Sequence, residues 1–325
     1  MRNTRGGIAH MAGVIEEDLV DRDTGLAKWY IRGLADLAAA ALATRSVNTS
    51  EWLAVLPRDS DAKSKERYIS RWLSNPKIDP TQAMAGFMPE ILLSAGSGDR
   101  TVVLMLDQSK VASEFECLMV SLRVGERAVP VAWKVVETEG AIGFDVQKPL
   151  LETVAAMIPK GIKILLAGDR FYGTAALIGW CKKHGWDYRI RLKSNLTLIH
   201  EDAEITTGEA ARMKLSALLN ARFGGITTNI GILHEEGHKE PWIIAMNEKP
   251  SKGRVLDYGM RWGIEPMFSD FKSRGFGITN THLQHPDRIE RLILVLTIAI
   301  FWAVSTGMAP PDKPATHTKK KPIAP

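Results

Sequence analysis

The chain has 325 residues, of which 45% are hydrophobic and 24% charged, a balance typical of globular proteins with one large or two modest domains. Its formal net charge of +5 favours an anionic partner only weakly. The two cysteines exclude a disulfide framework, and the N-terminus lacks an apolar run long enough for a signal peptide. We therefore expect a protein of a reducing, cytoplasmic compartment.

Residues 1–85 are predicted to form an all-helical N-terminal domain. The segment 26–46 is rich in alanine and leucine, and two shorter helices are expected within 46–57 and 59–76, each ending before a proline. A helix-turn-helix-like DNA-binding unit and a plain helical bundle with a solvated basic face are equally compatible with this pattern. The cations of the second short helix that would contact DNA are Lys63, Lys65, Arg67 and Arg71.

The next region alternates strands and helices. Strands are expected at 101–109, 116–124, 127–137, 162–169 and 187–193, with helices at 146–161 and 174–185. This order predicts an α/β fold in which a mixed sheet is flanked by helices. Residues 194–250 are polar and rich in strand-forming residues, which indicates a β-rich insertion.

Two helices are expected to follow, at 252–274 and 286–308. The apolar stretch 292–309 is near the minimum length of a membrane span. Because the helix begins in the polar sequence THLQHPDRIERL, we expect it to be buried in a core, with no membrane association. Residues 311–325 lack core-forming side chains and are predicted to be a disordered basic tail.

The sequence HEEGH at 234–238 fits the zinc-peptidase pattern H-E-x-x-H. That pattern binds zinc only on a helix, where its two histidines share one face. Here it contains a glycine, is followed by Pro241 and lies between ITTNIGIL and WIIAMN, which are β-branched and apolar. These flanks favour the turn of a β-hairpin, and a membrane-anchored zinc peptidase is the weaker alternative.

Two aspartates lie where predicted strands end. Asp107 follows VVLML, and Asp169 follows IKILLAG. A carboxylate at the end of a buried strand is costly to leave unpaired and is well placed to hold a cation. If the two strands are neighbours, the pair is suited to Mg²⁺, which prefers oxygen ligands.

A third acid lies in DYGMRWGIEPMFSDFKSRG. On an ideal helix, four residues would share one face: Tyr258, Arg261, Glu265 and Lys272. Their offsets of 0, 3, 7 and 14 residues correspond to positions within a narrow arc around the helix axis. This face would display a carboxylate among two cations and a phenol, a set that suits phosphodiester chemistry. Pro266 requires the helix to kink or restart nearby.

The spacing Y-x2-R-x3-E-x6-K resembles the YREK signature of the DDE insertion-sequence transposases of family four. Asp107 in LDQSK and Asp169 in GDRFYG resemble the first and second aspartates of that family, and TRSVNTSEWLAVLP resembles the sequence of its N-terminal helices. The resemblance covers about residues 25–308.

The resemblance implies an RNase H-like catalytic domain at 98–310, with the β-rich insertion at about 194–250. Asp107, Asp169 and Glu265 would then be the catalytic and metal-binding triad, with two Mg²⁺ ions for which Mn²⁺ would substitute. Tyr258, Arg261 and Lys272 would hold DNA phosphates. Trp242 would stack on a base flipped from the transposon end, or would instead anchor a strand in the core.

The implied activity is DNA transposition, in which the transposon end is nicked and the freed 3′-hydroxyl attacks another phosphodiester, either of the opposite strand, which gives a hairpin, or of target DNA. The partners would be double-stranded DNA, as terminal inverted repeats and target, and a second copy of the chain in a synaptic homodimer. A nucleoid-associated bacterial protein is expected. The alternative is a catalytically dead or domesticated relative that only binds DNA.

Overall fold

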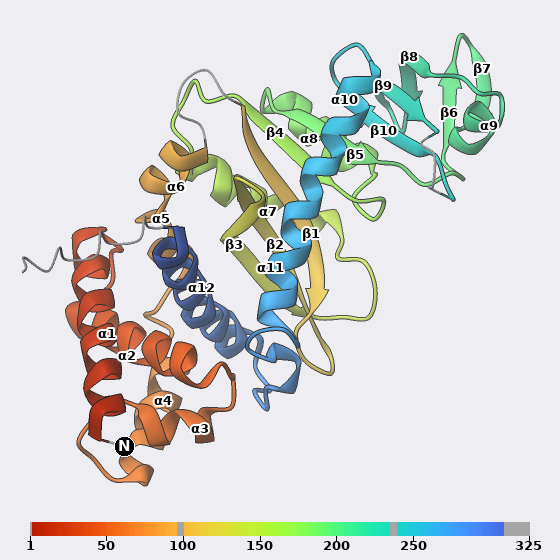
Figure 1. The fold of residues 1–325 in the computed structure, drawn as a ribbon. Helices are drawn as coiled ribbons and strands as arrows, with labels where there is room; N and C mark the ends of the chain where they lie inside the picture. The colour runs from red at the N-terminus through yellow and green to blue at the C-terminus, as the bar shows by residue number, and fades with distance from the viewer. Residues whose placement is uncertain (1, 96–100, 235–238, 309–325) are drawn as a thin grey trace, which may run out of the picture.

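The N-terminal part of the protein is helical, as predicted. The computed structural model describes residues 2–95, 101–234 and 239–308 (Figure 1). Asn48 caps the third helix through the Ser50 N–H, and Asp61 caps the fourth through the Ser64 N–H. The helices are α1 (Arg2–Asp21), α2 (Lys28–Thr44), α3 (Thr49–Val55), α4 (Ala62–Leu73), α5 (Pro80–Ala85) and α6 (Met88–Ala95).

The strands form one mixed sheet in the order β3-β2-β1-β4-β5-β10-β9-β8-β6-β7. β1 pairs parallel with β4, and β4 pairs parallel with β5, whereas β2 and β3 are antiparallel to their neighbours. The first five positions of this order are consistent with an RNase H-like core. The strands are β1 (Val102–Lys110), β2 (Phe115–Val124), β3 (Arg127–Glu137), β4 (Ile164–Gly168), β5 (Asp187–Arg191), β6 (Thr197–His200), β7 (Ala203–Thr206), β8 (Ala217–Phe223), β9 (Ile226–Leu233) and β10 (Trp242–Met246).

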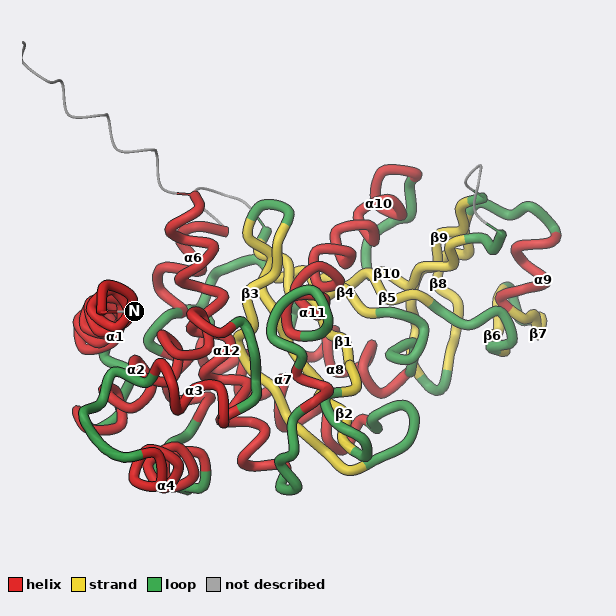
Figure 2. Tube along the Cα trace, turned by 60° about the horizontal axis from the view of Figure 1, so that its bottom comes forward, coloured by secondary structure: helices red, strands yellow, loops and turns green. Residues whose placement is uncertain are grey.

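The insertion predicted at 194–250 continues the core sheet. β10 lies between β5 and β9, and its pairing with β5 joins the later strands to the core (Figure 2). β9 and β10 pair antiparallel with Trp242 opposite Leu233, as the hairpin interpretation of HEEGH requires. His234 follows β9 outside any helix, and its Nε2 lies 3.0 Å from the carbonyl oxygen of Ala211. The remaining residues of the motif, 235–238, lie outside the described part of the chain.

Helices cover both faces of the core strands. α7 (Phe144–Met157) and α8 (Ala175–Lys183) contact each other on one face. On the other face, α10 (Lys252–Leu256), the 3₁₀ segment η1 (Asp257–Gly263) and α11 (Ile264–Phe271) follow one another across the strands in Figure 1. The short elements α9 (Thr207–Arg212) and η2 (Ile278–Asn280) complete this part of the fold.

α12 (Pro286–Met308) is a buried helix, as the sequence predicts. It lies between α2 and β3, so the N-terminal helices and the sheet pack on the same helix (Figure 1). Arg291, a charged residue of its first turns, is itself only 6% exposed and donates to the carbonyl oxygens of Ile78 and Leu73. No helix in the described ranges is both long and apolar enough to cross a membrane. The predicted tail at 311–325 lies outside those ranges.

One predicted DNA contact is wrong. Lys65 is 5% exposed, and its Nζ donates to the carbonyl oxygen of Leu53 at 3.1 Å, because it projects from α4 toward α3. Lys63, Arg67 and Arg71 are exposed and recur every fourth residue, so they share one outer face of α4.

Replacing Gly33 of α2 by alanine should lower the free energy of unfolding by about 1–3 kcal/mol. A Cβ at this position would lie 2.3 Å from Cδ1 of Trp72, a buried ring whose Nε1 is hydrogen-bonded to the carbonyl oxygen of Tyr30. Gly13→Ala in α1 is the matched control, since no atom lies within 4 Å of the position that its methyl group would take and alanine favours helix. Urea denaturation of both variants tests this, and an unchanged midpoint for Gly33→Ala would contradict it.

Candidate active site

Asp107 and Asp169 lie side by side on two neighbouring interior strands of the sheet. Leu106 of β1 is the parallel partner of Gly168 of β4, so each aspartate is the next residue on its strand. Asp107 Oδ1 accepts from the N–H of Gln108 at 2.9 Å, and Asp169 Oδ1 accepts from the N–H of Phe171 at 2.8 Å. The predicted pairing of these strands is thus present in the sheet.

Glu265 lies in the helical layer that covers the sheet, and Arg261 connects it to Asp107. The guanidinium of Arg261 donates from Nη1 to Asp107 Oδ2 at 2.9 Å and from Nη2 to Glu265 Oε1 at 2.8 Å. The side chains of Arg261 and Asp107 are 11% and 16% exposed, whereas that of Glu265 is 59% exposed. A partly desolvated ion pair therefore links the sheet to the first turn of α11.

The segment that carries these residues is not one continuous helix. Tyr258 and Arg261 lie in η1, and the α-helical geometry begins only at Ile264. Pro266 falls in the first turn of α11, where the missing N–H would have had no intrahelical partner. The restart therefore occurs before the proline and leaves the backbone around Glu265 regular.

Lys272 departs from the helical geometry of this group. It is the C-cap of α11 with ψ of −138°, so it leaves the helical face on which its spacing predicted it. Burial raises the pKa of Glu116 on β2, and the charge of Lys272 opposes that rise, which places the lysine near Glu116. Of the four residues predicted to share a face, Arg261 and Glu265 are in direct contact, and the guanidinium of Arg261 lies 5.9 Å from the ring centroid of Tyr258.

The electrostatics of the site centre on Asp107. Burial raises its pKa to about 6, the charge of Arg261 opposes this rise, and the charges of Asp169 and Glu265 add to it. All three carboxylates are therefore near enough to interact, and Asp107 is the one that burial makes costly to ionise.

The donor groups near Asp107 suit a hard divalent cation. They are carboxylate oxygens together with the phenol of Tyr172, whose pKa is raised first by burial and then by the charges of Asp107 and Asp169. The Tyr172 Oη is buried and has no hydrogen-bond partner in the described ranges. Within the same ranges, no three His, Cys, Asp or Glu side chains are arranged as a set of metal ligands. Arg261 lies between Asp107 and Glu265 instead.

Trp242 occupies a core position. It is 4% exposed and packs with Tyr258 and Trp262, whose ring centroids lie 5.4 and 5.5 Å from its own in edge-to-face geometry. Tyr258 is 3% exposed in the same small cluster. Trp242 thus has the core position that was the alternative to base stacking, and in this conformation protein atoms cover Tyr258 as well.

A buried arginine that the sequence did not single out holds the segment that leads into η1. Arg189 of β5 is 3% exposed. Its Nε donates to the carbonyl oxygen of Arg254 at 2.8 Å, and its Nη2 donates to Glu248 at 2.5 Å and to Asp257 at 3.2 Å. The guanidinium thus joins the sheet to the end of α10 and to the first residue of η1.

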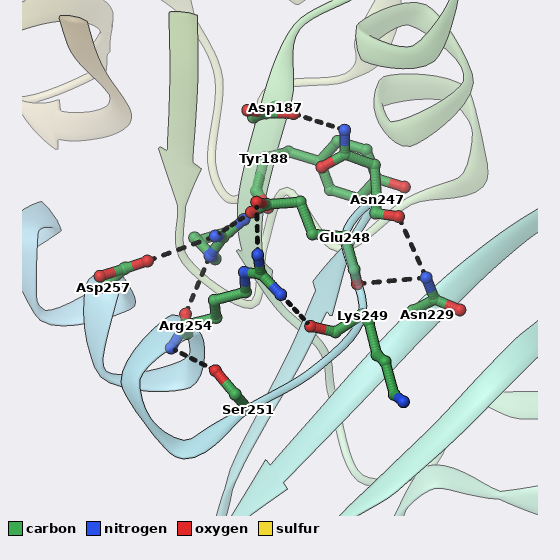
Figure 3. Close-up of polar contacts among 10 residues, drawn as sticks. Asp187, Tyr188, Asn229, Asn247, Glu248, Lys249, Ser251, Arg254 and Asp257 are labelled. Carbon is green, nitrogen blue, oxygen red and sulfur yellow. Dashed lines mark hydrogen bonds and ion pairs between the residues drawn. The ribbon is translucent and has the colours of Figure 1, made fainter. Parts of the chain in front are cut away.

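Further contacts hold the same connection. Arg254 donates to the carbonyl oxygen of Lys249 at 2.7 Å and pairs with Glu248 at 3.2 Å (Figure 3). Asn229 of β9 donates to the carbonyl oxygens of Asn247 and Glu248. The chain therefore enters η1 from an anchored position, four residues before Arg261.

Replacing Arg189 by leucine should lower the free energy of unfolding by about 2–4 kcal/mol, because Glu248, Asp257 and a carbonyl oxygen lose a charged donor. Arg222→Leu, which removes an exposed ion pair with Asp202, should change it by less than about 1 kcal/mol. Hydrogen exchange by mass spectrometry should show faster exchange at 248–262 in the Arg189 variant alone. Equal protection of this segment in both variants would refute the anchoring role.

Replacing Asp107 by asparagine should stabilise the metal-free protein at neutral pH. Because folding raises the pKa of Asp107, protonation of this side chain stabilises the folded state. This stabilisation is fully present below the ordinary pKa near 4 and is lost as the pH rises to about 6. The wild type should therefore lose stability relative to Asp107→Asn between pH 4 and 6. Urea titrations in EDTA across this range measure the difference, and a constant difference would show that the pKa is ordinary.

Comparison with known proteins gives one family match. Residues 143–302 match the family described as Transposase DDE domain. The matched stretch contains Asp169, Arg189, Arg261 and Glu265 and begins after β3, so Asp107 precedes it. This match supports a DDE transposase.

Two other comparisons add no argument about function. No curated protein matches the chain significantly. The crystal structure of human ENDOV is 11% identical, covers 68% of this chain and 98% of its own, and has a TM-score of 0.25. A likeness at this level does not bear on fold or activity.

Proposed function

We propose that the protein is a DNA transposase that cleaves the ends of an insertion sequence and transfers the freed strand, with Asp107, Asp169 and Glu265 as its catalytic carboxylates. The observation that carries the proposal is the adjacency of Asp107 and Asp169 on parallel strands, with Arg261 joining Asp107 to Glu265. The YREK spacing and the family match over 143–302 support it.

The divalent cations of this chemistry, Mg²⁺ or Mn²⁺, would be held by the carboxylates of Asp107, Asp169 and Glu265. Oxygen-only donors at the carboxyl ends of two strands suit such ions. When bound, they supply a polarised water or 3′-hydroxyl and charge stabilisation at the phosphodiester. The protein's part is to keep the donors together, and Asp107 must give up its proton to take part.

The guanidinium of Arg261 would bind carboxylates in the free protein and phosphate once DNA is bound. In the free protein its guanidinium neutralises Asp107 and Glu265, and its buried Nε has no hydrogen-bond partner in the described part of the chain. Phosphate oxygens accept the same charged N–H donors as carboxylates do. DNA bound at the site would compete for this guanidinium and release Glu265 toward the aspartates. Lys272 and Tyr258 would add phosphate contacts after a rearrangement of their surroundings.

The N-terminal helices would bind the terminal repeats. Lys63, Arg67 and Arg71 on the outer face of α4 provide phosphate contacts, and such contacts make affinity fall steeply with salt. A homodimer would hold two transposon ends together. Attack on the opposite strand would give excision through a hairpin, and attack on target DNA would give insertion.

The test uses purified protein with the DNA that flanks its own gene, including the terminal repeats. With Mg²⁺ or Mn²⁺ the wild type should cut at the transposon end. Glu265→Gln should cut more slowly by roughly 10²–10³-fold or more, because the divalent cation that stabilises the developing negative charge loses a carboxylate ligand. Glu204→Gln, an exposed acid on β7, is the matched control and should cut normally.

Other results would redirect the assignment. Salt-sensitive binding of the terminal repeats without cleavage by the wild type would indicate a DNA-binding relic. Cleavage that survives Glu265→Gln would remove Glu265 from the triad, and an absence of both binding and cleavage would overturn the proposed function.

A further inference from the structure

A cavity opens next to the paired aspartates. It has a volume of about 370 Å³, within the range of pockets that hold small organic groups. Its lining comes from the loop after β4, the end of β5 and the residues before β10, and includes Arg170, Phe171, Arg191, Lys193, Ser194 and Glu240. The cavity therefore begins next to Asp169 in the chain.

Phe171 is the unusual member of this lining. Half of its surface is exposed, although large aromatic side chains are mostly covered in folded proteins. The hydrogen bond from its N–H to Asp169 Oδ1, at 2.8 Å, fixes its backbone relative to the candidate site. The ring thus presents an apolar face to the cavity, on a backbone that is held two residues from Asp169.

Cations line the same cavity as this ring. The Nζ of Lys193 lies 5.5 Å from its centroid. Arg170 and Arg191 both pair with one carboxylate oxygen of Glu240, at 3.2 and 3.5 Å. Glu240 is 63% exposed, so it is an accessible anion that occupies two guanidinium groups in the free protein. Three cations facing one carboxylate leave the cavity with an excess of positive charge.

The walls of the cavity are rigid. A Cβ on Gly173 would lie 2.7 Å from the carbonyl oxygen of Arg191, so the loop after β4 packs directly on the end of β5. The hydroxyl of Thr207 donates to the carbonyl oxygen of Lys193, and the N–H of Gly208 donates to that of Ser194. The cavity is therefore formed before any ligand arrives, which lowers the entropy cost of binding.

We propose that this cavity binds one unpaired nucleotide of DNA, with its base stacked on Phe171 and its phosphates held by Lys193, Arg170 and Arg191. An aromatic face can stack on a base only where the base is not already stacked in a duplex, so the occupant is unpaired. The guanidinium groups recognise phosphate oxygens in place of Glu240. The inference rests on the proposed function for its DNA partner and gives that function a site for the strand next to the cut.

The test measures stacking without any cleavage. The probe is a short single-stranded oligothymidylate with one central 2-aminopurine, mixed with the full-length protein in EDTA. The wild type should quench the fluorescence of the probe. Phe171→Ala should bind the probe roughly tenfold or more weakly and lose the quenching, because one base–aromatic stack is removed. Phe171→Trp should restore both.

A control variant at another exposed aromatic residue tests whether the quenching is specific to Phe171. Trp262 is 44% exposed near the candidate site but does not line the cavity, so Trp262→Ala should quench the probe like the wild type. Quenching that survives Phe171→Ala, or that is lost in Trp262→Ala instead, would overturn the proposal. Failure of the wild type to bind the probe would overturn it too. Quenching by Phe171 in a protein that never cuts DNA would keep this site and remove only the proposed activity.

The anion in the cavity gives a second, independent readout. Glu240→Gln should bind the same probe more tightly at a given salt concentration, because Arg170 and Arg191 are then free for phosphate. Lys193→Gln should reduce the slope of log affinity against log salt by about 0.7, the value for one phosphate of a single strand. Unchanged affinity in the first variant and an unchanged slope in the second would exclude phosphate from the cavity.

Discussion

The contact on which the candidate site depends is the guanidinium of Arg261 between Asp107 and Glu265. One acid comes from a buried strand and the other from an exposed helical turn, and Asp107 is repelled by both of the other acids. Without a cation between them, three carboxylates this close would not stay together. Arg261 can act only because η1 begins at an anchored residue, so Arg189 of β5 controls the geometry one step earlier. Arg189 thus positions the start of η1, and Arg261 in turn holds the carboxylates together.

The sequence predicted the parts of this site that follow from local pattern. Asp107 follows the apolar run of β1 and Asp169 follows β4, and residues at the same level of a parallel pair of strands lie close together. The spacing of Arg261 and Glu265 predicted one face, which their shared contact confirms. The parts that failed depend on distant neighbours. Nothing within α4 shows that Lys65 turns toward Leu53, and nothing near Trp242 shows that Tyr258 and Trp262 cover its ring.

The role of Arg189 could not be predicted from its neighbours in the chain either. In DYRIRLK it alternates with apolar residues as a solvent-facing strand cation does, and only the return of 248–257 onto β5 buries it. The same strand carries Arg191 into the cavity beside Asp169, and because the two arginines are two residues apart on β5, both lie on the same face of the sheet. Because β10 pairs with β5, the inserted strands also form the wall of that cavity and the start of the anchored connection.

Because α12 packs on both the N-terminal helices and the sheet, neither part can be removed without exposing its apolar side chains. Leu292, Val295 and Leu296 are fully buried in a core that runs from the N-terminal helices to the sheet. A fragment cut after residue 85 would leave this helix with one side uncovered, where leucine and valine would meet water. A gene that lost this first quarter would therefore yield an insoluble remnant, not a competitor that occupies the cleavage site without binding the repeats. Defective copies of this type would be silent in the cell rather than inhibitory.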